Sequence, residues 1–300
     1  MKYRASILLF LATAVPAMAG PNFDEAVAFF EDHDYPMAIE IAEPLAGQGD
    51  ARAMAMMGAI YQKGLGAGID LQKAIEWYGM AAKKGHEQSQ FALGMIYLDG
   101  SLGGVDYDLG AKWLRQAAEA GNAEAQFNMG LLSSGAFGNP PDWADAASWY
   151  RKSADQGFAG GEYNLGVLFL EGKGVDHSQT KAAQWFAKAA AQGHPDAALD
   201  YGVLVFRGEG VQKDEKIGAQ WLLVAARRGN VVAQNRVARL YAFGKGFPAD
   251  PIEAAKWNIL AAKGGRPDAE LDNLLAKLTD EQKSEAQSRA DVFVPQVAEK

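Results

Sequence analysis

Apolar residues recur three and four positions apart along most of this 300-residue chain, which is the spacing of amphipathic helices. In the stretch that shows it best, Leu165 and Phe169 share one helical face. Further on, Ala182, Trp185 and Ala189 share another. A glycine-containing loop separates the two faces, and a glycine follows the second. The pattern predicts a helical hairpin and requires no strand.

This hairpin repeats every 36 residues. Six of the seven Trp residues lie on that period: Trp77, Trp113, Trp149, Trp185, Trp221 and Trp257. A column of small residues lies nineteen positions before them: Gly58, Gly94, Gly130, Gly166, Gly202 and Ala238. We expect the small residues to let two helices approach closely and the Trp side chains to fill the gaps between hairpins.

The repeats define the predicted organisation. Six tandem hairpins occupy residues 50–265, preceded by a divergent capping hairpin at 20–49 and followed by capping helices and a tail at 266–300. Acidic residues stand where five of the six second helices begin, and we interpret them as N-caps: Asp70, Asp106, Asp142, Asp214 and Asp250. His86, Asn122, His194 and Asn230 share another turn position, and we interpret them as turn or cap residues.

The repeated unit reads A-x-x-x-L-G-x-x-Y/F-x-x-G-x-G-V, then K-A-x-x-W-x-x-x-A-A-x-x-G. It resembles the Sel-1-like repeat, a relative of the tetratricopeptide repeat; the best copy lies at 161–193. The resemblance implies an all-α fold, a right-handed α-solenoid of antiparallel helix hairpins (an α-α superhelix), that binds other proteins. Exported bacterial members are similar to regulators and adaptors of envelope signalling, exopolysaccharide production or host contact, and the resemblance therefore implies a protein-binding scaffold or adaptor. A minority resemble β-lactamase-type enzymes with a disulfide in every repeat, but this chain has no Cys.

The first residues predict export. Lys2 and Arg4 precede an apolar run at 5–15, and a small-x-small site ends at Ala19, as in a secretory signal peptide cleaved after that residue. We therefore expect a periplasmic or secreted protein without membrane insertion. The net charge of −8 becomes −10 after cleavage, which disfavours a nucleic-acid partner.

No set of residues predicts chemistry. The four His residues do not form a zinc motif, the chain has no Cys nucleophile, and no nucleophile elbow occurs. We expect no catalytic residue, cofactor or metal. Two alternatives to a scaffold stay open: an envelope hydrolase of the β-lactamase-like subgroup, and a carbohydrate or small-ligand binder that stacks on the aromatic columns.

A binding groove is predicted on the first helices, which line the concave face of such solenoids. Repeats two to five carry apolar columns there: Phe91, Met95, Phe127, Leu131, Tyr163, Val167, Leu170, Leu199, Val203 and Phe206. Core packing is the alternative for the aromatic column, while the column that begins with Met95 is less demanded by packing. A peptide or helix is the expected ligand. Arg52 and Arg239 stand at either end as possible clamps for an acidic group.

Overall fold

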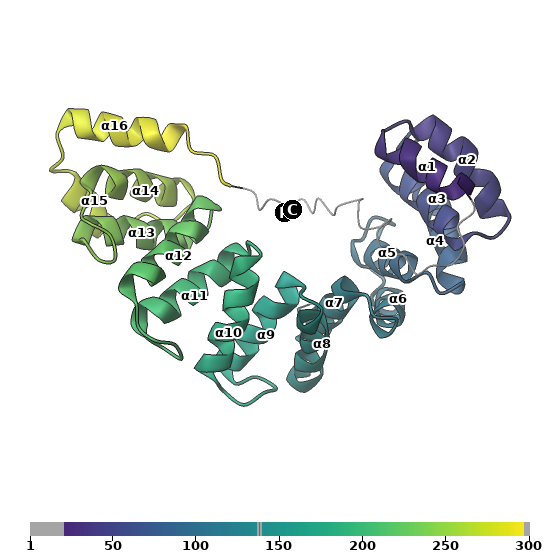
Figure 1. Cartoon of the computed structure of the whole chain (residues 1–300), viewed down its shortest axis with the longest axis horizontal. Helices are drawn as coiled ribbons and strands as arrows, with labels where there is room; N and C mark the ends of the chain where they lie inside the picture. Colours follow the sequence, from purple (N-terminus) through teal and green to yellow (C-terminus); the bar gives the residue numbers. More distant parts are fainter. Residues whose placement is uncertain (1–20, 137, 139, 297–300) are drawn as a thin grey trace. The chain divides into compact units, whose positions relative to one another are not determined.

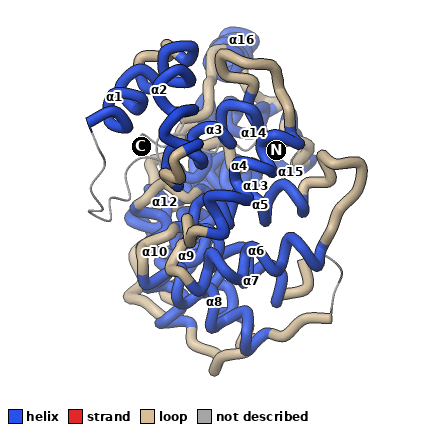
Figure 2. Tube along the Cα trace, turned by 90° about the vertical axis from the view of Figure 1, so that its right-hand side faces the viewer, coloured by secondary structure: helices blue, strands red, loops and turns tan. Residues whose placement is uncertain are grey.

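The computed structural model describes residues 21–136, 138 and 140–296, so the predicted signal peptide lies outside the described residues. The described part contains helices and loops but no strand (Figure 1, Figure 2). It confirms the predicted all-α fold. The chain forms two compact units, which meet in sequence between Leu132 and Ser133.

Unit 1 contains the first seven helices: α1 (Pro21–Glu31), α2 (Tyr35–Gly47), α3 (Ala51–Lys63), α4 (Leu71–Lys83), α5 (Glu87–Leu98), α6 (Tyr107–Glu119) and α7 (Ala123–Ser133). Each helix from α1 to α5 packs against the next one along the chain. The unit is therefore a stack of hairpins in which α1 and α2 form the first layer.

Unit 2 contains the remaining helices: α8 (Trp143–Asp155), α9 (Ala159–Glu171), α10 (Gln179–Ala191), α11 (Pro195–Arg207), α12 (Glu215–Arg227), α13 (Val231–Phe243), α14 (Pro251–Lys263), α15 (Ala269–Leu275) and α16 (Asp280–Asp291). Consecutive helices from α8 to α15 are in contact, and α16 packs against α14. A continuous core, built largely of Ala and Leu, runs from α10 to α16.

The side chain that fills each hairpin is the one directly after the Trp. Tyr78, Leu114 and Phe186 are completely buried, whereas four of the six repeat Trp residues are only half-buried: Trp77, Trp113, Trp185 and Trp221. These four Trp side chains therefore fill the gaps between hairpins only in part. Successive helical residues differ by about 100° around the axis. That rotation turns the residue after the Trp toward the first helix. The Trp lies beside the preceding repeat instead, so that Trp113 shares a hollow with Met80 and Trp185 shares one with Arg151.

The glycine column makes room for this buried side chain. A Cβ on Gly166 would lie 2.7 Å from the Phe186 ring, and one on Gly58 would lie 2.6 Å from the Tyr78 ring. Non-bonded carbon atoms prefer separations of about 3.5–4.0 Å. Glycine is thus required here by close helix packing, in agreement with the predicted role of the small column.

The sixth repeat carries Ala238 in the glycine column, and its partner differs as well. Asn258, smaller than Phe or Tyr, replaces the large side chain after the Trp and is nearly buried. Its Nδ2 donates a hydrogen bond to Asp272 Oδ1 at 2.7 Å. The extra methyl group of Ala238 is therefore matched by a smaller partner that finds its hydrogen bond in α15.

The predicted helix caps are confirmed at every acidic position. In each case the side chain accepts backbone N–H groups of the first helical turn: Asp70, Asp106, Asp142, Asp214 and Asp250. His86 and His194 cap α5 and α11 in the same way. These caps satisfy donors that would otherwise lack partners at a helix start.

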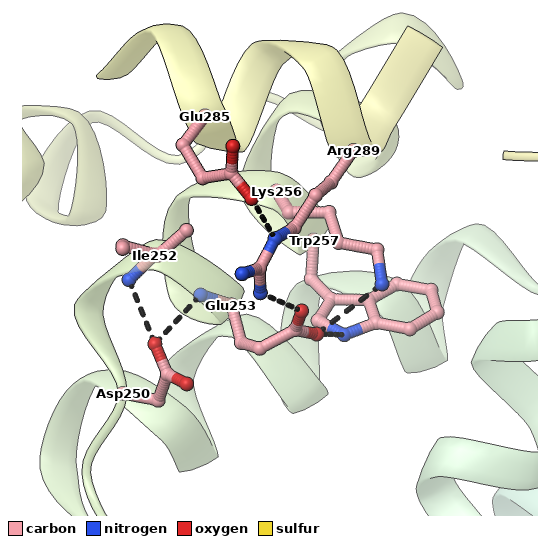
Figure 3. Close-up of polar contacts among 7 residues, drawn as sticks. All are labelled: Asp250, Ile252, Glu253, Lys256, Trp257, Glu285 and Arg289. Carbon is pink, nitrogen blue, oxygen red and sulfur yellow. Dashed lines mark hydrogen bonds and ion pairs between the residues drawn. The ribbon is translucent and has the colours of Figure 1, made fainter. Parts of the chain in front are cut away.

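The C-terminal helix closes the array through an ionic cluster (Figure 3). Arg289 of α16 contacts Glu253 Oε1 at 2.9 Å and Glu285 Oε1 at 2.8 Å. Glu253 Oε2 accepts hydrogen bonds from Trp257 Nε1 at 3.1 Å and Lys256 Nζ at 3.2 Å. This cluster and the overlying Phe293 ring, 5.5 Å away, leave Trp257 only 1% exposed.

Candidate functional site

The predicted groove residues of unit 1 lie on two first helices. Phe91 and Met95 are one turn apart on α5, and Phe127 and Leu131 are one turn apart on α7. All four side chains are half-buried. Each helix therefore presents two large apolar side chains that are neither core nor fully solvated.

The predicted groove residues of unit 2 are also half-buried. Three lie on α9 and three on α11: Tyr163, Val167, Leu170, Leu199, Val203 and Phe206. Four of them, Tyr163, Leu199, Val203 and Phe206, pack against the core of the unit. These side chains thus contribute to packing and still leave part of their apolar surface accessible.

Tyr163 is held by a polar network that the sequence did not reveal. Its ring stacks on His194, with centroids 4.6 Å apart, and its hydroxyl donates a hydrogen bond to Asp200 Oδ2 at 3.2 Å. Burial raises the pKa of Tyr163 and of Asp200, and it lowers the pKa of His194. The neutral His194 ring accepts the Ala197 N–H at 3.3 Å, as an N-cap requires.

The two arginines suggested as clamps already have partners within the chain. Arg52 forms an ion pair with Asp50 at 2.9 Å and lies over the Phe23 ring. Arg239 contacts Asp268 at 2.7 Å and Glu270 at 3.0 Å. Arg52 pairs with a carboxylate two residues away, whereas Arg239 pairs with one that is 29 residues away in sequence.

Asp268 explains why the apolar columns stop at repeat six. Arg239 donates two hydrogen bonds to its carboxylate, at 2.7 and 2.9 Å, and Asn235 donates a third at 2.9 Å. Arg239 is the main reason that the pKa of Asp268 falls to about 2. Asp268 in turn caps α15. The polar residues of the sixth repeat therefore anchor the C-terminal cap.

Six consecutive matches to the Sel1 repeat cover residues 51–86, 87–122, 123–158, 159–194, 195–230 and 231–265. The chain belongs to the Sel1 repeat family. Proteins of this family generally serve as protein-interaction scaffolds and are typically non-catalytic.

Solved structures agree with this assignment. A Sel1 repeat protein from Oxalobacter formigenes is 26% identical, with a TM-score of 0.71, over 81% of this chain and 97% of its own. The protective antigen c5321 of uropathogenic Escherichia coli, which has an SLR fold, is 28% identical with a TM-score of 0.57. That match covers 92% of this chain and 68% of the antigen. No protein among curated sequences matches this Sel1 repeat chain.

Titratable residues of this Sel1 repeat protein are scattered. Among the described residues, no three His, Cys, Asp or Glu side chains are grouped so that they could hold a metal ion. His33 and His177 are exposed, and His86 and His194 are helix caps. The described helices include none that is long and apolar enough to cross a membrane.

Proposed function

We propose that this Sel1 repeat protein is an exported scaffold that binds a peptide or helix of another protein along its first helices. The observation that carries the proposal is the repeated pair of half-buried apolar side chains on α5, α7, α9 and α11. Side chains one turn apart present the spacing that an apolar helix face or an extended peptide recognises.

The available apolar surface is enough for a reversible complex. Complete burial of a Val, Leu or Phe side chain contributes about 1.5–3 kcal/mol, so covering the smaller part that stays exposed contributes at most roughly 1 kcal/mol each. Only part of such a sum appears as affinity, because association and ordering of side chains oppose it. We therefore expect moderate affinity and a dependence on several repeats together.

Export forms the second part of the proposal. The signal-peptide pattern that ends at Ala19 supports a periplasmic or secreted location, and an adaptor role in the envelope fits that location. N-terminal sequencing of the protein recovered from the periplasm or the medium tests this directly. A mature chain that starts at Gly20 supports export, whereas an intact Met1 in the cytoplasm contradicts it.

The binding experiment is affinity capture from an envelope extract with a tagged mature chain. The test variant adds four charges to the first helices: Met95→Glu, Leu131→Glu, Val167→Glu and Val203→Glu. The control variant adds four charges at exposed positions elsewhere: Gln72→Glu, Ser148→Glu, Gln212→Glu and Gln220→Glu. Circular dichroism first verifies that both variants keep the helical content of the wild type.

A protein retained by the wild type and the control but lost by the test variant supports the proposed surface. A protein retained equally by all three chains contradicts it and places binding elsewhere. If purified mature chain instead turns over a β-lactam or another envelope substrate, and a point change abolishes turnover without unfolding, the scaffold proposal fails.

A further inference from the structure

A basic hollow lies on the second helices of unit 2, apart from the apolar columns. This basic hollow has a volume of about 480 Å³. It is lined by Arg151, Phe169, Lys181, Gln184, Trp185, Ala187 and Lys188. Arg151 comes from α8, Phe169 from α9 and the others from α10. These three helices are consecutive, and α9 packs against both α8 and α10 (Figure 1).

Three cations surround two aromatic rings in this hollow. The Arg151 guanidinium lies 5.5 Å from the centroid of the Phe169 ring, and Lys181 Nζ lies 5.1 Å from the same centroid. Lys188 Nζ lies 3.9 Å from the centroid of the Trp185 ring. One such cation–π contact is an ordinary surface feature. Three like charges around one hollow repel each other unless an anion joins them.

Within the described residues, Glu162 interacts electrostatically with Lys188, but no carboxylate pairs directly with the cations of the hollow. The lining contains no carboxylate, and none of the three cations forms an ion pair. Other lysines of the unit do pair, for example Lys213 with Glu215 at 2.7 Å. Glu162 is buried and accepts a hydrogen bond from Gln192, so it does not line the hollow.

The corresponding hollow in unit 1 shows that this charge is not a requirement of the repeat. It is lined by Ile75, Glu76, Gly79, Met80, Lys83, Leu93, Tyr97 and Trp113. Trp113 and Tyr97 lie two 36-residue repeats before Trp185 and Phe169, so the two hollows occupy equivalent places in their repeats. A single lysine and a single glutamate line the first hollow, so its charges balance.

We propose that the basic hollow binds an acidic peptide segment, with a Glu or Asp carboxylate between the three cations and a neighbouring apolar side chain against Trp185. Lys and Arg form charge-assisted hydrogen bonds with a carboxylate, which are stronger than neutral ones. One repeat further on, the equivalent positions carry Ile217 and Val224, which are apolar. A polyanion with a charge on every unit would therefore meet no cation beside the next repeat. The net negative charge of the protein also repels polyanions, so a short acidic segment fits better.

The test uses the full mature chain and a capped leucine–glutamate–glutamate–leucine peptide at millimolar concentration. Proton–nitrogen NMR of the seven Trp indole groups reports binding, and Trp185→Phe assigns the relevant signal. We expect the Trp185 signal to shift with this peptide and not with its glutamine analogue. Lys181→Gln with Lys188→Gln weakens binding about tenfold or more. Lys83→Gln in the unit 1 hollow, the matched control, leaves it unchanged.

Three results overturn the inference. The first is no shift of the Trp185 signal with the acidic peptide. The second is an equal shift with the glutamine analogue, because the carboxylate then plays no part. The third is tighter binding of an oligogalacturonate than of the peptide, which assigns the hollow to an acidic sugar. The groove variant with four added Glu residues keeps this site intact, so the two proposals fail independently.

Discussion

Gly166→Ala tests the packing rule that organises every hairpin. The new Cβ would lie 2.7 Å from Cδ1 and Cε1 of Phe186, so the completely buried ring must retreat by about 1 Å. Overpacking of this kind costs about 1–3 kcal/mol. Alanine also favours a helix over glycine by about 0.8–1 kcal/mol, which offsets part of the loss. We expect a net destabilisation of up to about 2 kcal/mol.

A matched control separates the two contributions. Gly79 lies inside α4, and a Cβ placed on it would meet nothing within 4 Å. Gly79→Ala therefore gains the helix propensity without a clash and should stabilise its hairpin by up to about 1 kcal/mol. In the double variant Gly166→Ala with Phe186→Ala the clash disappears. The coupling energy between these two sites should be about 1–3 kcal/mol.

Hydrogen exchange measured by mass spectrometry is the appropriate assay. Repeats contact only their neighbours, so a single unfolding free energy does not describe a repeat array well. Local opening free energies of α9 and α10 should fall in Gly166→Ala, while those of α4 rise in Gly79→Ala. If both variants stabilise their helices equally, the buried residue after the Trp does not require the glycine and the reasoning is refuted.

Three further predictions follow from the described contacts. Trp149→Ala should cost about 3–5 kcal/mol and Trp185→Ala clearly less, because only Trp149 is buried; urea unfolding of the two variants compares them, and equal losses contradict the difference. Asp268→Asn should destabilise by about 1–2 kcal/mol at pH 7. Because the folded pKa of Asp268 is lowered to about 2, this difference is complete above the unfolded pKa and should vanish as pH falls from 5 toward 2; a constant difference across thermal melts contradicts it. Glu253→Gln should speed hydrogen exchange in α16 while exchange in α9 stays unchanged, because Arg289 loses an ionic partner; protection equal to the wild type in α16 contradicts it.

The sequence predicted the features that depend on local chemistry. The 36-residue period predicted the repeats, and the acidic residues before five of the six second helices predicted their caps, because a cap contacts backbone only two or three residues away. The sequence did not predict which of two adjacent large side chains faces the first helix of a hairpin. Trp185 and Phe186 are both large and apolar, and the periodicity did not show which of them faces the first helix.

Contacts between distant residues also escaped prediction. Arg239 and Asp268 are separated by 29 residues, and Arg289 and Glu253 by 36, so no local pattern joins them. The basic hollow collects side chains from three helices. The candidate groove was predicted as columns of residues, and the structure adds that all ten are half-buried. That these residues bind a ligand stays a prediction.

By covering the last hairpin, α16 also affects whether copies of the protein can associate end to end. A solenoid whose last layer is uncovered offers the same surface to the first layer of another copy, and such head-to-tail contacts propagate into filaments. Here the layer after α14 is occupied by the chain's own α16, locked by Arg289 and Glu253. Another copy can therefore pack against α14 only after the ion pair between Arg289 and Glu253 breaks and α16 moves away.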